Sequence, residues 1–401
     1  MLSLEEARER ILDAVRPLPA ETAPLHEAWG RFLAEPLRSA IDLPPAHNSA
    51  MDGYAVRSED LAAARAEAPV ALRLIGAAPA GVVFDKTVER GTCARVLTGS
   101  LLPPGADAVV MQEDVKQNDQ DQSRILFSES APPGDNIRSR GEDVRAGALL
   151  LEADEKLTAA RLGLLAAAGI SDVRLGGRPR TGLVATGSEL REAGAALEPG
   201  AIYESNRIGL AALARQAGAL PRVYPLTRDD LGATRGALEQ AFSECDAVIT
   251  TGGVSVGDMD WVKPAFADLG GELDFWTVSM RPGKPFAFGR LGDKLLFGLP
   301  GNPVSALVCF VLLARPALLR FQGAREVMPR AIPAMLAEPL SNHAARRHFM
   351  RVALDERGMA RSAGPQASHI LSAMARAHGL VDVPPKATLA AGETVSVIPF
   401  E

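Results

Sequence analysis

The chain has 401 residues, which gives room for about two to four domains and for large hydrophobic cores. Apolar residues make up 47% and charged residues 23% of the sequence, a composition typical of a soluble globular protein. The net charge of −6 argues against a protein that binds long nucleic acids, because phosphate neutralisation needs an excess of Lys and Arg. A local basic pocket would still suffice for a small anion.

The cysteines and the apolar runs bear on the compartment in which the chain works. Cys93, Cys245 and Cys309 lie far apart, outside any C-x-x-C or Cys/His cluster, so they predict neither a structural zinc site nor a disulfide framework. We expect each to be a small core residue in a reducing compartment. The N-terminus is too charged for a signal peptide, and the apolar run over residues 304–314 is too short for a bilayer. A cytoplasmic protein with no membrane segment and no nucleic-acid partner is expected.

The first third of the chain predicts one helix and then a β-rich region. Ser3 and Glu6 form a capping-box pattern, and apolar residues then recur at helical spacing as far as Val15. Prolines break the following stretch, up to about residue 45, into extended segments. Between residues 46 and 140, short apolar runs separated by Gly and Pro predict strands at Val70–Ile75, Cys93–Leu97, Ala108–Met111 and Arg124–Phe127.

The middle of the chain predicts an α/β domain. A helix over residues 157–169 ends at Gly169, and strands and helices then alternate from Arg180 to about residue 320. The predicted strands are Thr181–Ala185, Pro221–Pro225, Ala247–Thr250 and Leu295–Gly298, and the predicted helices are Asn206–Gly218, Leu231–Ser243, Trp261–Leu269 and Pro303–Arg315. This alternation indicates a parallel sheet covered on both faces, in which ligands bind at the carboxyl ends of the strands. The last 75 residues return to short strands and predict a small β domain.

The run from Asp246 to Asp260 carries the clearest chemical signal. A buried strand breaks into Thr250-Thr251-Gly252-Gly253, where the missing Cβ atoms let backbone N–H groups approach a phosphate closely. Asp258 and Asp260 follow and would repel a bare phosphate, so the pattern indicates an anionic ligand whose charge is bridged by a divalent cation. Alternatively, Asp260 only caps the next helix.

Two more acidic turns follow predicted strands of the same sheet. Thr186-Gly187-Ser188-Glu189 suits a phosphate-cradling turn, although a capped helix start has the same pattern. In Arg228-Asp229-Asp230, Asp230 is a plausible N-cap, which leaves Asp229 as a candidate for the crevice. Mg²⁺ takes one or two carboxylates plus substrate phosphate, so the predicted metal ligands are the four crevice acids Glu189, Asp229, Asp258 and Asp260.

A basic loop and a capped helix follow. Arg281 and Lys284 flank a Pro-Gly turn, and a fixed pair of cations suits a small oxyanion, although a solvated turn would also fit. Asn302 and Pro303 have the N-cap and N1 character of a helix start, which either binds an anion or is simply well capped. In the β-rich region, Asp52-Gly53 fits either a hairpin turn or a polar site.

The remaining polar residues carry little chemical signal. The run Arg138–Asp143 is more typical of an exposed loop, and the segment 117–123 of a hairpin tip. We expect His26, His343, His348 and His378 at the surface. The sequence has no H-E-x-x-H, P-loop or G-x-G-x-x-G motif, which argues against zincins, P-loop kinases and ordinary dinucleotide dehydrogenases.

Taken together, the motifs resemble the molybdopterin molybdenumtransferases, the MoeA and gephyrin E-domain family. The matching segments run in order along essentially the whole chain: Asn48–Ala55, Thr98-Gly99, Pro104–Asp107, Arg138–Asp143, Thr186–Leu190, Asn206-Arg207, Arg228–Asp230, Thr251–Gly257, Pro282–Gly289, Leu299–Ser305, Phe349–Arg351 and Ser368–Ile370.

The resemblance implies a reaction and an architecture. Such enzymes insert molybdate into adenylylated molybdopterin, cleave its pyrophosphate bond, release AMP and need Mg²⁺. The implied fold is a homodimer of four-domain subunits with the active site across the subunit interface. The expected domains are an extended linker domain (1–45 and 144–177), a β-rich domain (46–143), a three-layer α/β domain with a mostly parallel sheet (178–325) and a small C-terminal β-barrel (326–401).

The resemblance also assigns roles by position. The catalytic candidates are Glu189, Asp229 and Asp260, together with Asp52 and Asp143 from the partner subunit. The substrate-binding candidates are Thr98, Arg138, Thr186, Gly187, Ser188, Gly252, Gly253, Ser255, Pro300, Asn302 and Pro303. The molybdate-binding candidates are Arg281, Lys284, Arg351 and Ser368.

Two positions depart from the family, and two other functions stay open. The family usually has Lys where this chain has Arg281, and some relatives have Lys at Thr277. An enzyme that adenylylates molybdopterin would need only the central α/β part. A gephyrin-like scaffold without catalytic activity would be expected to carry fused domains.

Overall fold

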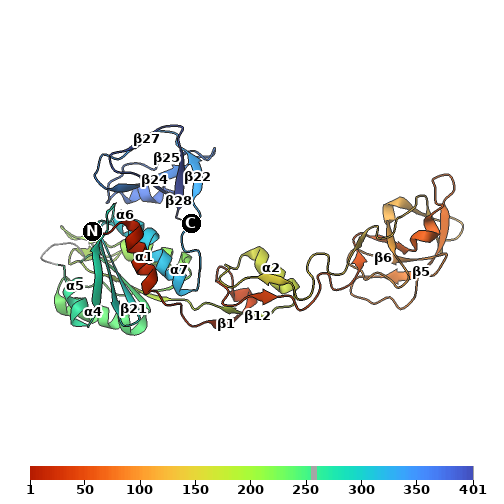
Figure 1. The fold of residues 1–401 in the computed structure, drawn as a ribbon, viewed down its shortest axis with the longest axis horizontal. Helices are drawn as coiled ribbons and strands as arrows, with labels where there is room; N and C mark the ends of the chain where they lie inside the picture. Colours follow the sequence, from red (N-terminus) through yellow and green to blue (C-terminus); the bar gives the residue numbers. More distant parts are fainter. Residues whose placement is uncertain (254–259, 401) are drawn as a thin grey trace. The chain divides into compact units, whose positions relative to one another are not determined.

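The structure is a computed structural model that describes residues 1–253 and 260–400 (Figure 1). Two of the predicted site residues, Ser255 and Asp258, lie outside the described residues. The chain divides into two compact units. The first unit comprises residues 1–35, 153–158 and 172–401, and the second comprises residues 36–152 and 159–171.

A six-stranded sheet forms the centre of the first unit, in the order β16-β13-β17-β21-β20-β18. Its strands are β16 (Leu220–Val223), β13 (Arg180–Ala185), β17 (Ala247–Thr251), β21 (Lys294–Leu299), β20 (Pro285–Leu291) and β18 (Glu272–Thr277). The first four are parallel, which confirms the pattern predicted from the sequence. The antiparallel edge of β20 and β18 was not predicted.

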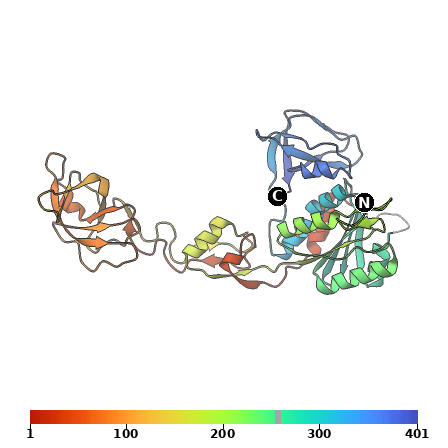
Figure 2. The same cartoon turned by 180° about the vertical axis from the view of Figure 1, so that it is seen from behind.

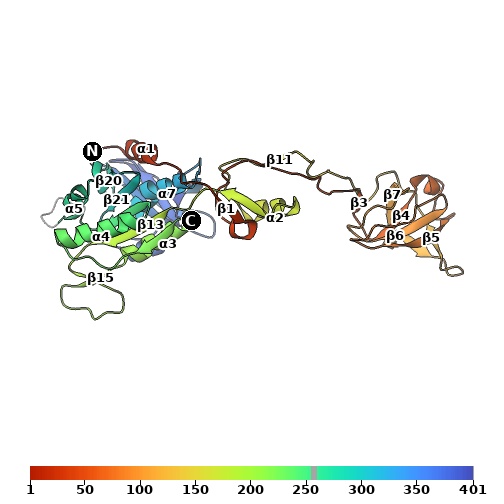
Figure 3. The ribbon, with the colours of Figure 1, turned by 90° about the horizontal axis from the view of Figure 1, so that it is seen from below.

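Helices cover both faces of this sheet (Figure 3). Val184 and Val248 point into a core with α4 (Leu231–Glu244) and α5 (Val262–Asp268). Their neighbours Leu183 and Ile249 point into a larger core on the opposite face, because successive side chains of a strand alternate between faces. That core includes α1 (Leu4–Ala14), α3 (Asn206–Gln216) and α6 (Pro303–Cys309).

The helix that follows β21 is longer than the sequence predicted. It begins with α6, passes through a π-helical turn at Phe310–Ala314 and ends with α7 (Arg315–Phe321). By length and composition this segment could cross a membrane, but 83% of its apolar window is buried inside the structure. The apolar side chains of this helix are therefore packed in the core of the first unit.

The N-terminal helix is capped as predicted. The Ser3 hydroxyl accepts the backbone N–H of Glu6 at 3.1 Å, and the Glu6 carboxylate accepts the Ser3 N–H at 2.8 Å. A single 3₁₀ turn (Leu25–Glu27) follows β1, and β1 (Glu21–Pro24) pairs antiparallel with β12 (Asp172–Leu175).

The end of the chain forms a second sheet in the same unit, seen from behind in Figure 2. Its order is β19-β24-β26-β28-β22, with β25 on β24. The strands are β19 (Met280–Arg281), β24 (Arg347–Leu354), β26 (Gly379–Val383), β28 (Thr394–Pro399), β22 (Ile332–Met335) and β25 (Ala360–Ser362), and the smaller elements are β23 (Leu340–Ser341), β27 (Thr388–Leu389) and α8 (Leu371–Ala375). Phe349, Leu380 and Phe400 from this part join the core around α6 and α7.

The second unit is β-rich, as predicted. Its main sheet has the order β7-β4-β6-β5-β9-β8. These strands are β7 (Ala108–Met111), β4 (Gly53–Val56), β6 (Thr92–Val96), β5 (Val70–Ala78), β9 (Arg124–Phe127) and β8 (Val115–Gln117). The unit also contains two short strand pairs: β2 (Leu37–Arg38) with β11 (Leu149–Leu151), and β3 (Asn48–Ser49) with β10 (Ile137–Arg138). Its helical elements are α2 (Ala159–Ala167) and the 3₁₀ turns Ser58–Leu61 and Gln112–Asp114. Antiparallel β8 and β9 confirm the hairpin predicted around residues 117–123.

Candidate functional site

Two predicted turns meet where β13 and β16 end. Beyond β13, Thr186 pairs with Thr227, and the Gly187 N–H donates to the Thr227 carbonyl at 3.1 Å. The Ser188 N–H then donates to Oδ2 of Asp229 at 2.8 Å, and the Asp229 N–H donates to the Ser188 hydroxyl at 3.3 Å. The phosphate-type turn and the crevice acid therefore form one unit at the ligand-binding edge of the sheet.

The Gly-rich turn after β17 lies against this pair of turns. Gly252 and Gly253 have φ values of +83° and +65°, which favour glycine. A Cβ on Gly252 would lie 2.5 Å from the Thr186 carbonyl oxygen, and one on Gly253 would lie 2.9 Å from the Thr186 hydroxyl. Both glycines are thus required by conformation and by the close approach of the two turns. The buried Thr186 hydroxyl bonds no group among the described residues.

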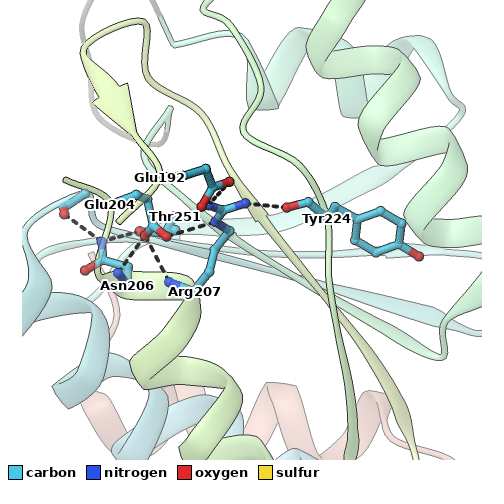
Figure 4. Close-up of polar contacts among 7 residues, drawn as sticks. Glu192, Glu204, Asn206, Arg207, Tyr224 and Thr251 are labelled. Atoms are coloured by element: carbon cyan, nitrogen blue, oxygen red, sulfur yellow. Dashed lines mark hydrogen bonds and ion pairs between the residues drawn. The ribbon is translucent and has the colours of Figure 1, made fainter. Parts of the chain in front are cut away.

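Asn206, which the sequence analysis did not assign to the site, joins the Gly-rich turn to the turn after β21. Its amide donates to the Thr251 hydroxyl at 2.6 Å and to the Gly301 carbonyl at 2.8 Å (Figure 4). Gly301 also lies close to Gly252, since a Cβ on Gly301 would be 3.7 Å from the Gly252 Cα. The only sequence signal for this role is that Asn206 stands in one of the family-like motifs.

The helix start after the Leu299-Pro300 turn is confirmed in position. Asn302 occupies the N-cap of α6 and Pro303 its first turn, but the Asn302 side chain makes no capping hydrogen bond. Instead, the Val304 N–H donates to the backbone carbonyl of Ser368 at 3.2 Å. The start of α6 is therefore bound to the loop that carries a predicted molybdate residue.

The predicted molybdate residues come from segments that contact one another. Arg351 is 1% exposed, and its guanidinium donates to the carbonyl of Ala367, next to Ser368, at 3.2 Å. Arg281 lies on β19, which pairs with the strand of Arg351. Between Arg281 and Lys284, Gly283 packs on α6, where a Cβ would lie 2.4 Å from the Cys309 sulfur. Arg281, Lys284 and Arg351 are cations, and Ser368 carries a hydroxyl. Both kinds of group can donate hydrogen bonds to an oxyanion.

His348 corrects an expectation of the sequence analysis. It is not at the surface but only 3% exposed, and its Nε2 bonds no group among the described residues. Arg281 is its register partner on β19. Burial, with added repulsion from Arg281 and Arg351, lowers the pKa of His348 to about 4. The imidazole is therefore neutral beside the cationic residues.

In the second unit, the structure brings Asp52 and Thr98 together. Oδ1 of Asp52 accepts the backbone N–H of Thr98 at 2.7 Å and its hydroxyl at 2.8 Å. These bonds, the backbone N–H first, hold the pKa of Asp52 below its usual range. Asp52 and Thr98 also line a pocket with Met51 and Gln112.

Arg138 and Asp143 lie on neighbouring segments of that unit. Arg138 is the register partner of Asn48 on β3, four residues before Asp52. Asp143 is exposed, and its backbone N–H donates to the Leu43 carbonyl at 3.1 Å.

The predicted magnesium site is only partly described. Within residues 1–253 and 260–400, no group of three or more His, Cys, Asp or Glu side chains is arranged to hold a metal ion. Glu189 is exposed and Asp229 half-buried, and Oδ1 of Asp229 accepts no hydrogen bond from the described residues. Hard carboxylate oxygens of this kind fit a cation that takes most of its other ligands from substrate phosphate and water.

Comparison with known proteins decides the family. The chain matches the MoeA N-terminal region (domain I and II) over residues 2–169, a probable molybdopterin binding domain over residues 182–320, and the MoeA C-terminal region (domain IV) over residues 333–400. It is 38% identical to a molybdopterin molybdenumtransferase of Haemophilus influenzae, with 100% of this chain and 99% of that protein covered. The chain belongs to the MoeA family of molybdopterin molybdenumtransferases.

Other MoeA relatives agree over the full length. Molybdopterin molybdenumtransferase 2 of Mycobacterium tuberculosis is 38% identical over 96% of both chains. The crystal structure of the molybdopterin biosynthesis MoeA protein of Pyrococcus horikoshii OT3 superposes with a TM-score of 0.84 at 32% identity, covering 99% of this chain and all of that one. The MoeA chain described here is thus a transferase of molybdenum cofactor biosynthesis.

Proposed function

We propose that the chain inserts molybdate into adenylylated molybdopterin, with cleavage of the pyrophosphate bond and release of AMP. The observation that supports this most is a continuous set of contacts. The Gly252 turn neighbours Gly301, the helix that starts at Pro303 bonds the Ser368 loop, and the adjacent Ala367 carbonyl holds Arg351. A nucleotide-type turn and an oxyanion-type cluster thus meet at the start of α6.

Each part of this edge has a task in the proposed reaction. The N–H groups of Thr186, Gly187, Ser188 and Gly252 already donate within the protein, which fixes the shape of these turns. The Thr186 hydroxyl, which bonds no group among the described residues, is the donor that they leave for the pterin nucleotide. Arg281, Lys284, Arg351 and Ser368 bind molybdate, whose two negative charges favour fixed cations and hydroxyl donors. Metal-binding sulfurs are not required of the protein, because the dithiolene of molybdopterin supplies them. Water attacks one phosphorus of the pyrophosphate and forms a new P–O bond as the bridging P–O bond breaks, so that one phosphate stays on the pterin and the other leaves in AMP.

Mg²⁺ would be held by Glu189, Asp229 and Asp260, with Asp258 as a fourth candidate. When bound, the cation would neutralise charge on the pyrophosphate as its bond breaks. Asp229 is oriented for this by the N–H of Ser188, which fixes one carboxylate oxygen and leaves the other for the ion.

The proposal includes a dimer and a domain division. In a homodimer, Asp52, Thr98, Arg138 and Asp143 of one subunit would complete the active site of the other. The proposed domains are the linker domain (1–45 and 144–177), the β-rich domain (46–143), the α/β domain (178–325) and the C-terminal β-barrel (326–401). A cytoplasmic location fits the synthesis of a cofactor from soluble intermediates.

The direct test is AMP release. Purified protein is incubated with adenylylated molybdopterin, molybdate and Mg²⁺, and AMP is quantified by chromatography. We expect release that requires both molybdate and Mg²⁺. Release that ignores molybdate, or none at all, would overturn the proposal. Formation of adenylylated molybdopterin from ATP and molybdopterin would instead support the adenylyltransferase alternative.

A further inference from the structure

The first turn of α3 lies at the edge of the sheet where the candidate site is formed. The buried carboxylate of Glu204 accepts the backbone N–H groups of Asn206 at 2.6 Å and Arg207 at 2.9 Å. Glu204 therefore caps the helix by itself, because these are N–H groups that a helix leaves unpaired. The side chains of Asn206 and Arg207 are not needed for capping.

Arg207 uses its whole guanidinium group on three partners (Figure 4). Its Nε donates to Glu204 at 2.8 Å, one Nη donates to Glu192 at 2.8 Å, and the other donates to the carbonyl of Tyr224. Arg207 is only 2% exposed. Burial of a charged group is unfavourable unless its partners are fixed, so the three contacts must persist together for this arrangement to be stable.

Two of the three partners of Arg207, Glu192 and Tyr224, belong to the two segments that carry the candidate metal ligands. Glu192 follows Glu189 by three residues in the loop after β13, and Tyr224 leads through Thr227 to Asp229. These segments also pair directly, since the Thr227 N–H donates to the carbonyl of Ala185 at 3.0 Å. Arg207, which belongs to α3, is thus a second connection between these two segments.

Asn206 connects a different pair of segments. Its amide bonds the Thr251 hydroxyl and the Gly301 carbonyl, in the turns that follow β17 and β21. Its Oδ1 is buried and bonds no group among the described residues. Arg207 therefore connects the segments after β13 and β16, and its neighbour Asn206 connects the turns after β17 and β21.

We propose that Asn206 and Arg207 are positioning residues with separate tasks. Arg207 sets the separation of the acidic segments that hold Mg²⁺, and Asn206 sets the separation of the turns that bind the pterin nucleotide. This inference rests on the proposed function. It predicts that substitution of Arg207 raises the half-saturating Mg²⁺ concentration, whereas substitution of the adjacent Asn206 raises the KM for adenylylated molybdopterin.

The acidic half is tested with Arg207→Lys and Glu192→Gln. Lys keeps the charge but cannot make three fixed contacts. Glu192→Gln keeps an acceptor oxygen but removes the negative charge from one contact, at a side chain that is exposed and not part of a core. We expect both variants to raise the half-saturating Mg²⁺ concentration, by at least about fivefold for Arg207→Lys, because metal ligands must be held in place. The KM for adenylylated molybdopterin should stay within about twofold.

The nucleotide half is tested with Asn206→Ala. We expect the KM for adenylylated molybdopterin and the Kd of AMP, measured by calorimetry, to rise by at least about fivefold, with the Mg²⁺ dependence within about twofold. AMP binding gives a readout that does not depend on turnover.

Matched controls separate positioning from loss of stability. Arg315 is also buried, and among the described residues its guanidinium bonds only the carbonyls of Pro399 and Phe400, so Arg315→Lys changes a buried Arg away from the site. Asn342 is 1% exposed, and its amide bonds the carbonyls of Arg346, Val383 and Pro384 at the ends of β24 and β26, so Asn342→Ala is the matching Asn variant. Neither control should change Mg²⁺ dependence, KM or AMP binding.

Hydrogen exchange decides the structural half of the inference even without turnover. Arg207→Lys should speed exchange in residues 187–192 and 224–229, and Asn206→Ala in residues 299–302, relative to the controls. The inference is overturned if Arg207→Lys and Asn206→Ala change the Mg²⁺ dependence and the KM alike. It is also overturned if Arg315→Lys and Asn342→Ala change these constants as much as the two test variants do. A wild-type protein that does not release AMP would refute the proposed function, and the exchange pattern would still decide the positioning.

Discussion

Asp229 and Asp230 are adjacent, but they bond different parts of the protein. Asp230 is the N-cap of α4, where its carboxylate accepts the backbone N–H of Ala233 at 2.7 Å. Asp229 bonds instead across the sheet edge to the N–H of Ser188. One acid of the pair is therefore accounted for by the helix, and the other is available to a ligand.

Asp229→Asn is expected to abolish most metal-dependent AMP release while leaving the fold intact. The amide oxygen can still accept the Ser188 N–H, but the negative charge that binds Mg²⁺ is gone. We expect kcat to fall by roughly a hundredfold, the size seen when one charge-stabilising group is lost. Asp230→Asn is the control, since Asn caps a helix as well as Asp, and its activity should be unchanged. Wild-type turnover by Asp229→Asn would contradict the assignment.

Lys284→Ala is expected to raise the molybdate concentration needed for half-maximal AMP release. A charge-assisted contact contributes about 1.5–3 kcal/mol, so the shift should be at least about tenfold. Lys294→Ala is the control. Lys294 is the first residue of β21, at the end of the strand away from the candidate site, where its ammonium bonds the Phe242 carbonyl. Its loss should leave the molybdate dependence unchanged. An equal response to molybdate in both variants would remove Lys284 from the oxyanion site.

The buried His348 predicts a pH dependence of stability. Its pKa is lowered to about 4 in the folded protein, whereas the unfolded chain keeps the ordinary value near about 6.5. The unfolded state therefore takes up a proton first as the pH falls, and stability is lost between these two values. Relative to pH 7.5, the loss at pH 5 from this group should be about 2 kcal/mol.

Comparison of His348→Gln with the wild type isolates this contribution. Carboxylates also weaken folding in acid, but they do so equally in both proteins. Urea unfolding at pH 7.5 and pH 5 should show a smaller pH effect in the variant. The same pH effect in both proteins would show that His348 is solvated, or protonated, in the native state.

The cysteines are expected to be unreactive in the native protein. All three are buried, and burial raises the pKa of Cys93 to about 12 and the pKa values of Cys245 and Cys309 above their ordinary range. Because the thiolate is the reactive form, a thiol reagent should modify none of them until guanidinium chloride unfolds the chain. Rapid modification of a native thiol would mean that its core opens locally.

The central strands could be predicted from the sequence because they are buried on both faces. Strands β13 and β17 carry nearly continuous apolar runs, and their ends differ from the prediction by a single residue. The edge strand β18 contains Glu272-Leu-Asp-Phe-Trp-Thr277, with its residues mostly half-exposed or exposed. Glu272 to Phe275 alternate polar and apolar residues over only four positions, a run too short to identify a strand that has one partner and an open edge.

The candidate site was predictable in its turns but not in the side chains that support them. Glycine and acidic residues after strands give a local signal, and Ser188 and Asp229 do meet. The burial of Arg207 depends on a carbonyl 17 residues away, and that of His348 on its place next to Arg281, so neither is visible in local sequence. Long charged or polar side chains are usually exposed, and only the folded structure shows the exception.

A shared active site predicts that two inactive variants restore each other. Asp52→Asn removes the acid held by Thr98 in the second unit, and Asp229→Asn removes the acid of the first. If the sites form across a homodimer, a mixed dimer contains one site with both acids intact and one site with neither. Random exchange of subunits makes about half of the dimers mixed, so the mixture should regain about a quarter of wild-type activity.

The experiment uses the two variants unfolded together and refolded, with each variant treated alone as the control. Recovery near a quarter requires residues of two chains in one site. Asp52→Asn mixed with Asp52→Glu, if that variant is also inactive, should regain nothing, because every site then lacks the same acid. An inactive mixture of Asp52→Asn and Asp229→Asn, shown by size to contain dimers, would place both acids in the site of a single chain or remove one of them from the reaction.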